Sequence, residues 1–243
     1  MPRTARASVA DMWCHVLNQG NRREVVFHRP ADYDAFVNAM ADAQTRLPVD
    51  ILGYCLMPNH FHLVIRTHAD GDMGRWVQWL LMAHARRYHR HYRTTGHVWQ
   101  GRFKAFPVQD DDHLLGVLRY VERNALRAEL VARADDWKWS SLPGWFSGDA
   151  LLWRGEVVVR DERWLERVNE PLSVGDLQRL RLSVERGQPY GEESWAKETA
   201  RTIGAGIDPS APGPTAKDGV KSLCPLFLFP VDSTTNSSRI RAG

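Results

Sequence analysis

Cysteines are few in this sequence, and they form no motif. The 243 residues include only Cys14, Cys55 and Cys224, and none of them belongs to a CxxC pair. An odd number of scattered cysteines argues against a disulfide framework and against a cysteine zinc site, and it favours a reducing compartment. Long apolar runs are missing too. No stretch approaches a length of about 18 apolar residues, which a membrane-spanning helix needs, and the N-terminus has no apolar region typical of a signal peptide. We therefore expect a soluble, cytoplasmic protein with no membrane partner.

The length and composition fit one globular domain with extensions. The chain is 43% apolar and 25% charged, which is ordinary for a folded protein, and it contains no internal repeat. Its last 40 or so residues are rich in Gly, Pro, Ser and Thr, a composition typical of disorder. We predict a core domain over residues 1–147, a helical extension over 148–203 and a disordered tail over 204–243.

Acidic residues are absent from one long interval, residues 73–109. The net charge of the whole chain is only +3, so the distribution of charge is more informative than its sum. Basic and aromatic residues alternate through this interval, and a groove for single-stranded nucleic acid needs cations for the phosphates and rings that stack on bases. A solvated helix face with core aromatics is the alternative. The candidate phosphate contacts are Arg86, Arg87, Arg90, Arg93 and Lys104.

Strand and helix patterns alternate in the first half of the chain. The predicted strands are 11–17, 49–57, 60–66 and 103–109, and the predicted helices are 31–46, 73–92 and 110–127. This βαββαβα order predicts an α+β fold, a ferredoxin-like split βαβ antiparallel sheet with helices on one face. Farther on, residues 173–203 have the pattern of a helical hairpin, with Ser173 as the first cap and a break at Gly187.

Two histidines one residue apart, His60 and His62, interrupt an apolar strand pattern. Side chains alternate between the faces of a strand, so both imidazoles project to one side, close enough to bind one metal ion or phosphate. A second HxH pair, His89 and His91, lies in a predicted helix, where residues i and i+2 point about 200° apart. The helical pair cannot share a ligand. Polar side chains on the open face of a half-exposed sheet are the alternative explanation for the strand pair.

Tyr120 and Asn124 lie four residues apart and therefore on one face of the last core helix. If this helix crosses the open side of the sheet, a phenol oxygen and an amide oxygen approach the two histidines. Two imidazoles and an amide oxygen suit Mg²⁺ or Mn²⁺, which would polarise a phosphodiester for attack by the phenol. Alternatively, Tyr120 only packs on the sheet, and Tyr88 or Tyr92 is the nucleophile.

Four sequence blocks resemble, in order and spacing, those of the REP-associated tyrosine transposases, a branch of the single-tyrosine HUH transposase superfamily. The blocks are YCLMPNHFHLVI, GHVWQGRF, LLGVLRYVERNALRAELV and DWKWSS, within roughly residues 9–145. The resemblance implies a ferredoxin-like nuclease domain in which His60, His62 and Asn124 bind the metal ion. It also implies that Tyr120 forms a 5′-phosphotyrosine with single-stranded DNA. The usual Asn-Pro pair of the family is Asn124-Ala125 here.

The resemblance also implies the partners of the protein. Hairpin-forming, REP-like DNA is the expected substrate, a monomer is favoured and a dimer is possible. Trp99, Gln100 and Arg102 stand where the family has its W-Q-x-R block, and we expect them to contact DNA. The alternative for Trp99 is that it anchors a turn.

We therefore predict a metal-dependent, single-stranded DNA endonuclease and strand transferase. A catalytically inactive nucleic-acid-binding module is the first alternative, although such sheets present aromatic side chains where this strand presents histidines. A zinc hydrolase ranks last, because no third histidine or carboxylate follows at zinc-site spacing.

Overall fold

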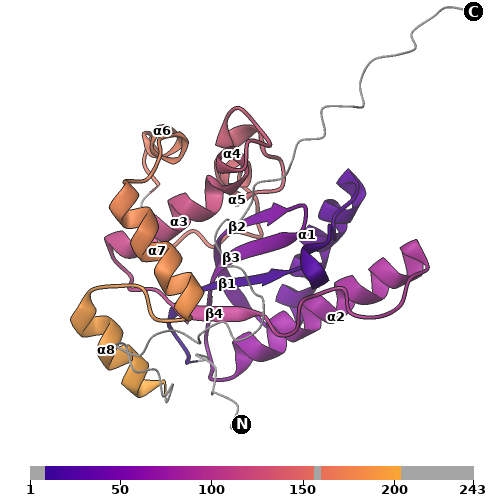
Figure 1. Ribbon diagram of the computed structural model, residues 1–243, viewed down its shortest axis with the longest axis horizontal. Coiled ribbons are helices and arrows are strands. Elements are labelled where there is room, and N and C mark those ends of the chain that lie inside the picture. Colours follow the sequence, from indigo (N-terminus) through magenta and orange to yellow (C-terminus); the bar gives the residue numbers. More distant parts are fainter. Residues whose placement is uncertain (1–8, 156–159, 204–243) are drawn as a thin grey trace, which may run out of the picture. The chain divides into compact units, whose positions relative to one another are not determined.

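The computed structural model describes residues 9–155 and 160–203. The predicted disordered tail, 204–243, lies outside these residues. Within them, one antiparallel sheet has the strand order β2-β3-β1-β4 (Figure 1). Pro58 and Asn59 form the tight turn that joins the edge strand β2 to its inner neighbour β3. The strand bounds are β1 Trp13–Gln19, β2 Val49–Met57, β3 His60–Thr67 and β4 Lys104–Pro107.

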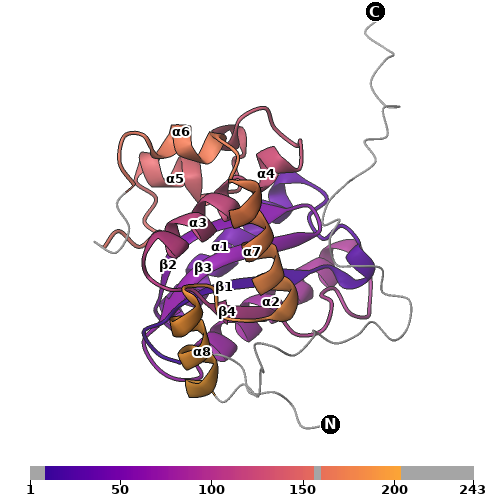
Figure 2. The ribbon, with the colours of Figure 1, turned by 60° about the vertical axis from the view of Figure 1, so that its left-hand side comes forward.

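Helices cover both faces of this sheet. α1 (Pro30–Arg46) and α2 (Asp72–Tyr92) pack on one face, and α3 (Asp112–Glu122) lies across the strands of the other, as Figure 2 shows. Phe61 and its strand neighbours at alternate positions enter a first core with α1 and α2, whereas Val64 enters a second core with α3.

The antiparallel ferredoxin-like sheet is confirmed, but the structure differs from the expectation of helices on one face. Residues 60–65 of β3 are all buried, as are residues 51–57 of β2. Strands whose two faces are both apolar have to be covered on both sides, since an exposed face would leave that area in water. α3 and the C-terminal extension cover the second face of the sheet.

The predicted helix over residues 110–127 is divided into α3 and a short α4 (Asn124–Arg127). Asp111 caps α3, because its side chain accepts a hydrogen bond from the backbone N–H of His113 at 2.8 Å. Arg123 separates the two helices with φ −80° and ψ −4°. This break places Asn124 at the start of a new helical turn.

The extension adds three helices, α6, α7 and α8, to the described part of the chain, while α5 lies at the end of the predicted core domain. The two predicted ones are present, with Ser173 accepting from the backbone N–H of Asp176 at 3.1 Å and Gly187 ending the first in the left-handed region at φ 65°. The bounds are α5 Ser141–Ser147, α6 Trp164–Asn169, α7 Val174–Arg186 and α8 Glu193–Thr202, with 3-10 turns at Asn21–Arg23 and Ala134–Asp136.

The extension contacts the sheet through backbone hydrogen bonds. Trp153 N–H donates to the Ile51 carbonyl, and Tyr190 N–H donates to the Pro107 carbonyl, both at 2.8 Å. The domain boundary at residue 147 stays a prediction. None of the described helices is both long enough and apolar enough to span a bilayer.

His84 is an imidazole buried in the first core. It is 2% exposed, its ring lies within 5.2 Å of the rings of Phe27, Phe36 and Trp99, and among the described residues neither ring nitrogen has a hydrogen-bond partner. Burial lowers the pKa of His84 from 6.5 to about 4. The imidazole is therefore neutral in the native protein over a range in which it is charged in the unfolded chain.

We expect His84 to make the protein sensitive to acid. As pH falls from 6.5 towards 4, the unfolded chain binds a proton that the native protein does not, so native stability decreases, by up to about 3 kcal/mol. His84→Leu should lose less stability over this window than the parent does. Urea unfolding at about pH 7 and about pH 4.5 checks this difference. Equal losses in both proteins would contradict it.

Candidate catalytic and metal site

His60, His62 and Tyr120 come together between the sheet and α3. The ring centroids of His60 and His62 are 5.0 Å apart, and those of His62 and Tyr120 are 5.8 Å apart. Each of the three residues is 2% exposed. Strand alternation puts the two imidazoles on the α3 side of β3, while Phe61 between them enters the first core. The helical pair His89 and His91 lies in α2.

The Nδ1 atom of each imidazole is engaged by a neighbour. His60 Nδ1 lies 2.7 Å from Asn59 Oδ1, and the Asn59 amide is oriented because its Nδ2 donates to the Arg23 carbonyl at 2.9 Å. His62 Nδ1 lies 2.8 Å from His15 Nε2. An amide oxygen only accepts, so His60 Nδ1 carries the hydrogen, and Nε2 is the nitrogen with which it would bind a metal ion.

His15, which sequence reasoning missed, supports His62 from the neighbouring strand. It is fully buried in β1, pairs in register with Val64 and projects to the α3 side, where its ring lies 6.2 Å from that of Tyr120. The sequence pattern that could have identified His15 is its place between Trp13 and Leu17 at alternate positions of β1, which puts the three side chains on one face of that strand. A partner that fixes the tautomer and orientation of a ligand histidine is usual around protein-bound metals.

Both candidate ligand histidines are held neutral. Burial lowers the pKa of His60 well below its ordinary value, and the positive charge of Arg127 adds to this shift. Burial has the same effect on the pKa of His62, with smaller contributions from His15, His60 and Arg127. A neutral imidazole keeps the lone pair that a metal ion requires, so both rings are in the ligand-competent form at neutral pH.

Asn124, the first residue of α4, is fully buried. Its Oδ1 accepts a hydrogen bond from Arg127 Nη2 at 2.7 Å. The Arg127 guanidinium lies 5.3 Å from the centroid of the Tyr120 ring. Sequence reasoning also missed Arg127, although its position three residues after Asn124 put both on one helix face.

The donor set of this site fits a divalent cation. His62 Nε2 and Asn124 Nδ2 are buried polar atoms that make no hydrogen bond within the described part of the chain. No group of three or more His, Cys, Asp and Glu residues in residues 9–155 and 160–203 is arranged to hold a metal. A cation here would therefore need the amide oxygen of Asn124 beside the two imidazoles, a combination suited to Mg²⁺ or Mn²⁺ rather than to a cysteine-rich zinc site.

The predicted DNA contacts separate into two groups. Arg87 is half-buried, donates to Asp32 Oδ1 at 3.0 Å and so has a structural partner, while Trp99 is 6% exposed and packs against Phe61. The other six side chains are exposed to solvent, and contact with DNA stays a prediction for all eight. These six are Arg86, Arg90, Arg93, Gln100, Arg102 and Lys104.

A cavity of about 340 Å³ lies beside this block. Met82 and Ala85 of α2 form one side, and the segment from Gly96 to Phe103 forms the other, including Trp99 and Arg102. The lining combines aromatic and apolar side chains with polar and basic ones, such as Gln78, His97 and Arg102, and this chemistry accommodates an unpaired base next to a phosphate.

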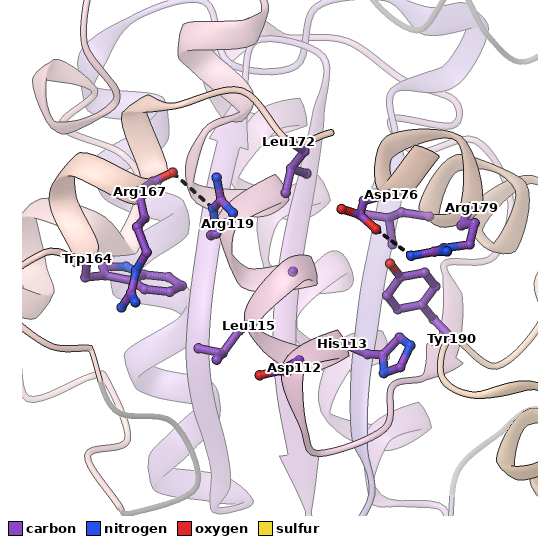
Figure 3. Close-up of a pocket in the computed structure, with 12 residues that line it drawn as sticks. Asp112, His113, Leu115, Arg119, Trp164, Arg167, Leu172, Asp176, Arg179 and Tyr190 are labelled. Atoms are coloured by element: carbon purple, nitrogen blue, oxygen red, sulfur yellow. Dashed lines mark hydrogen bonds and ion pairs between the residues drawn. The ribbon is translucent and has the colours of Figure 1, made fainter. Parts of the chain in front are cut away.

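A second cavity, of about 440 Å³, lies on the outer side of α3 against the extension (Figure 3). Its lining includes Leu115 and Arg119 of α3 and Trp164 of α6, but neither Tyr120 nor any candidate metal ligand. Arg119 Nε donates to the Arg167 carbonyl at 3.0 Å across this cavity (Figure 3). The cavity therefore marks the seam between α3 and the extension rather than the catalytic site.

Known proteins resemble this chain in sequence and in fold. Residues 8–124 match the family described as transposase IS200 like. A curated protein of Haemophilus influenzae, described as a REP-associated tyrosine transposase, is 26% identical over 122 residues, which cover 45% of this chain and 69% of that protein.

The fold resembles that of a REP-associated tyrosine transposase solved bound to a REP hairpin. The TM-score is 0.51 at 18% identity, over 71% of this chain and 99% of the other. Residues 8–124 therefore match a family of IS200-like transposases, and the chain is similar to REP-associated tyrosine transposases in sequence and in fold.

Proposed function

We propose that this transposase is a metal-dependent, single-stranded DNA endonuclease and strand transferase that uses Tyr120 as its nucleophile. The observation that carries the proposal is the packing of the Tyr120 ring against His62, which shares one face of β3 with His60. Both imidazoles are neutral, and their Nδ1 atoms are engaged by other residues. The arrangement thus combines a phenol with a ligand set for a cation.

The proposed reaction exchanges one phosphodiester for another. Tyr120 loses its proton as its oxygen attacks phosphorus, the bond from phosphorus to the 3′-oxygen breaks, and that oxygen takes up a proton. The 5′-phosphate is then esterified to Tyr120. His60, His62 and Asn124 would hold a Mg²⁺ or Mn²⁺ ion, which would stabilise the charge that develops at the phosphate. Attack by another 3′-hydroxyl reverses the sequence and rejoins DNA without an external energy source.

The proposed substrate is hairpin-forming DNA with a single-stranded segment. The exposed cations of the basic interval, such as Arg86, Arg90 and Lys104, would follow the phosphates. The cavity beside Trp99 would accept a base. The related transposase solved with a REP hairpin supports this choice. We favour a monomer, with a dimer as the alternative.

The metal requirement can be tested with labelled hairpin DNA on a denaturing gel. We expect a covalent protein–DNA adduct with Mn²⁺ and none with EDTA. His60→Ala/His62→Ala should also form none, because it removes two of the three proposed ligands. His89→Ala/His91→Ala is the matched control, since it removes the same residue types at the same spacing from a helix.

Two outcomes would decide against the proposal. Cleavage by the His60→Ala/His62→Ala variant would remove the role of the metal site. Salt-sensitive binding of hairpin DNA by the parent protein without any adduct would favour the inactive binding module instead.

A further inference from the structure

We propose that Arg127 is a further catalytic residue, which binds the scissile phosphate and, before DNA arrives, occupies the amide oxygen that the cation requires. The inference rests on the proposed function, because it takes Tyr120 and Asn124 as parts of one site. It makes binding of DNA and binding of the cation mutually dependent.

The position of Arg127 supports this role. Its guanidinium lies over the Tyr120 ring at 5.3 Å and donates from Nη2 to Asn124 Oδ1 at 2.7 Å. A fixed cation thus lies where a phosphate has to be bound next to the phenol.

The contact with Asn124 is one that a phosphate would replace. Asn124 offers a neutral amide oxygen, whereas a phosphodiester offers anionic oxygens in a geometry that a guanidinium can bind through two N–H groups. The bond to Asn124 is charged only on the donor side, whereas a two-point bond between guanidinium and phosphate is charged on both sides and therefore stronger. We therefore infer that Arg127 moves from Asn124 to the phosphate when DNA binds.

This exchange has a consequence for the cation. Without DNA, Arg127 competes for Asn124 Oδ1 and repels a positive ion from His60 and His62. With DNA, the guanidinium is neutralised by phosphate and the amide oxygen is available. Binding of DNA then increases the affinity for the cation, and by reciprocity the cation increases the affinity for DNA.

Mn²⁺ titrations with and without hairpin DNA test this coupling directly. They are made in a Tyr120→Phe background, in which the DNA stays uncut. In the Tyr120→Phe protein, which is the parent for these titrations, hairpin DNA should tighten Mn²⁺ binding by about tenfold or more. Adding Arg127→Met should tighten Mn²⁺ binding without DNA and abolish the further gain from DNA.

Adduct formation is measured in proteins that retain Tyr120. There, Arg127→Met should slow adduct formation by about 100-fold, the effect of losing one preorganised donor.

Two further variants separate this proposal from a structural role. Arg127→Lys keeps the positive charge, so its affinity for Mn²⁺ without DNA should equal that of the parent. This variant also keeps the test decisive if Arg127→Met does not fold. The matched control is Arg133→Met, because Arg133 is an exposed arginine that pairs with Asp135. This substitution should change neither the Mn²⁺ affinity nor the rate of adduct formation.

The outcomes distinguish this proposal from the proposed function. Weaker Mn²⁺ binding in Arg127→Met would show that Arg127 only positions Asn124 as a ligand, and would overturn the proposal. Unchanged Mn²⁺ affinity with and without DNA in the parent would also overturn it. If the Tyr120 protein forms no adduct but the coupling is present, the nuclease proposal fails and the coupling between Arg127, cation and DNA stands.

Discussion

Tyr120→Phe is expected to abolish the covalent adduct with hairpin DNA while leaving DNA binding intact. The substitution removes the oxygen that attacks phosphorus and keeps the ring that packs beside His62 and under Arg127. Loss of a nucleophile that no other group can replace lowers the rate by at least about 10⁴-fold. Loss of one buried hydroxyl costs only about 1 kcal/mol of stability, so the variant should fold.

The controls for Tyr120→Phe are the other tyrosines near the basic interval. Tyr88 lies in α2 and its hydroxyl is 2.9 Å from His28 Nε2, and the hydroxyl of Tyr92 donates to Asp32 at 2.5 Å. Both hydroxyls are thus engaged on the far side of the sheet from His60 and His62. Tyr88→Phe and Tyr92→Phe should form the adduct at the parent rate. An adduct that persists in Tyr120→Phe and disappears in either control would reassign the nucleophile.

The part of the site that follows from local periodicity could be predicted from the sequence. Alternation along β3 put His60 and His62 on one face, and helical spacing put Tyr120 and Asn124 on one face, because both rules act within a single element. The same rules gave the strands and the long helices to within a few residues. What they do not contain is the order of strands in the sheet.

His15 shows why the rest could not be predicted. It reaches His62 only because β1 pairs with β3, a contact across 47 residues of chain. His15 thus acts through tertiary placement, which single-element patterns do not encode. Arg127 is different, because helical spacing puts it on one face with Tyr120 and Asn124, and only its contacts with that ring and that amide had to come from the structure. Helix α6 was missed for a related reason, since its anchor Trp164 is fixed by a partner 42 residues away.

That partner is Glu122, a carboxylate with no exposed surface at the end of α3. Its Oε1 accepts from Arg160 Nη2 and from Ser141 Oγ, both at 2.7 Å, and its Oε2 accepts from Trp164 Nε1 at 2.8 Å. Arg160 also donates to the Leu52 carbonyl of β2 at 2.7 Å. The carboxylate therefore joins the helix that carries Tyr120 to the extension and to the sheet.

The close approach of α3 to β2 at this point depends on a glycine. A Cβ atom at Gly53 would lie 2.3 Å from a methyl carbon of Leu118 and 3.0 Å from Ser141 Oγ. The strand register is shifted between Ile51 and Gly53, beside the carbonyl that Arg160 binds. The strand backbone, α3 and the ion pair are therefore closely packed around Gly53.

Arg160→Met is accordingly expected to destabilise the protein by about 3 to 5 kcal/mol, because it leaves the Glu122 carboxylate buried without its cation. The loss is measured as a shift of the urea unfolding midpoint. Arg163→Met removes an arginine from the solvent-exposed pair with Glu166 and should leave the midpoint unchanged. Adding Glu122→Gln to Arg160→Met should restore part of the stability, since the remaining buried group is then neutral.

The double variant also tests what the extension does for catalysis. If Glu122 and Arg160 serve only to hold α3 against β2, Glu122→Gln/Arg160→Met should regain adduct formation in proportion to its regained folded fraction. Tyr120 is two residues from Glu122, so a displaced α3 would instead lower adduct formation even at temperatures where the variant is fully folded. Equal midpoints for Arg160→Met and Arg163→Met would contradict the role of the buried pair, because a carboxylate with no exposed surface cannot lose its cation without cost.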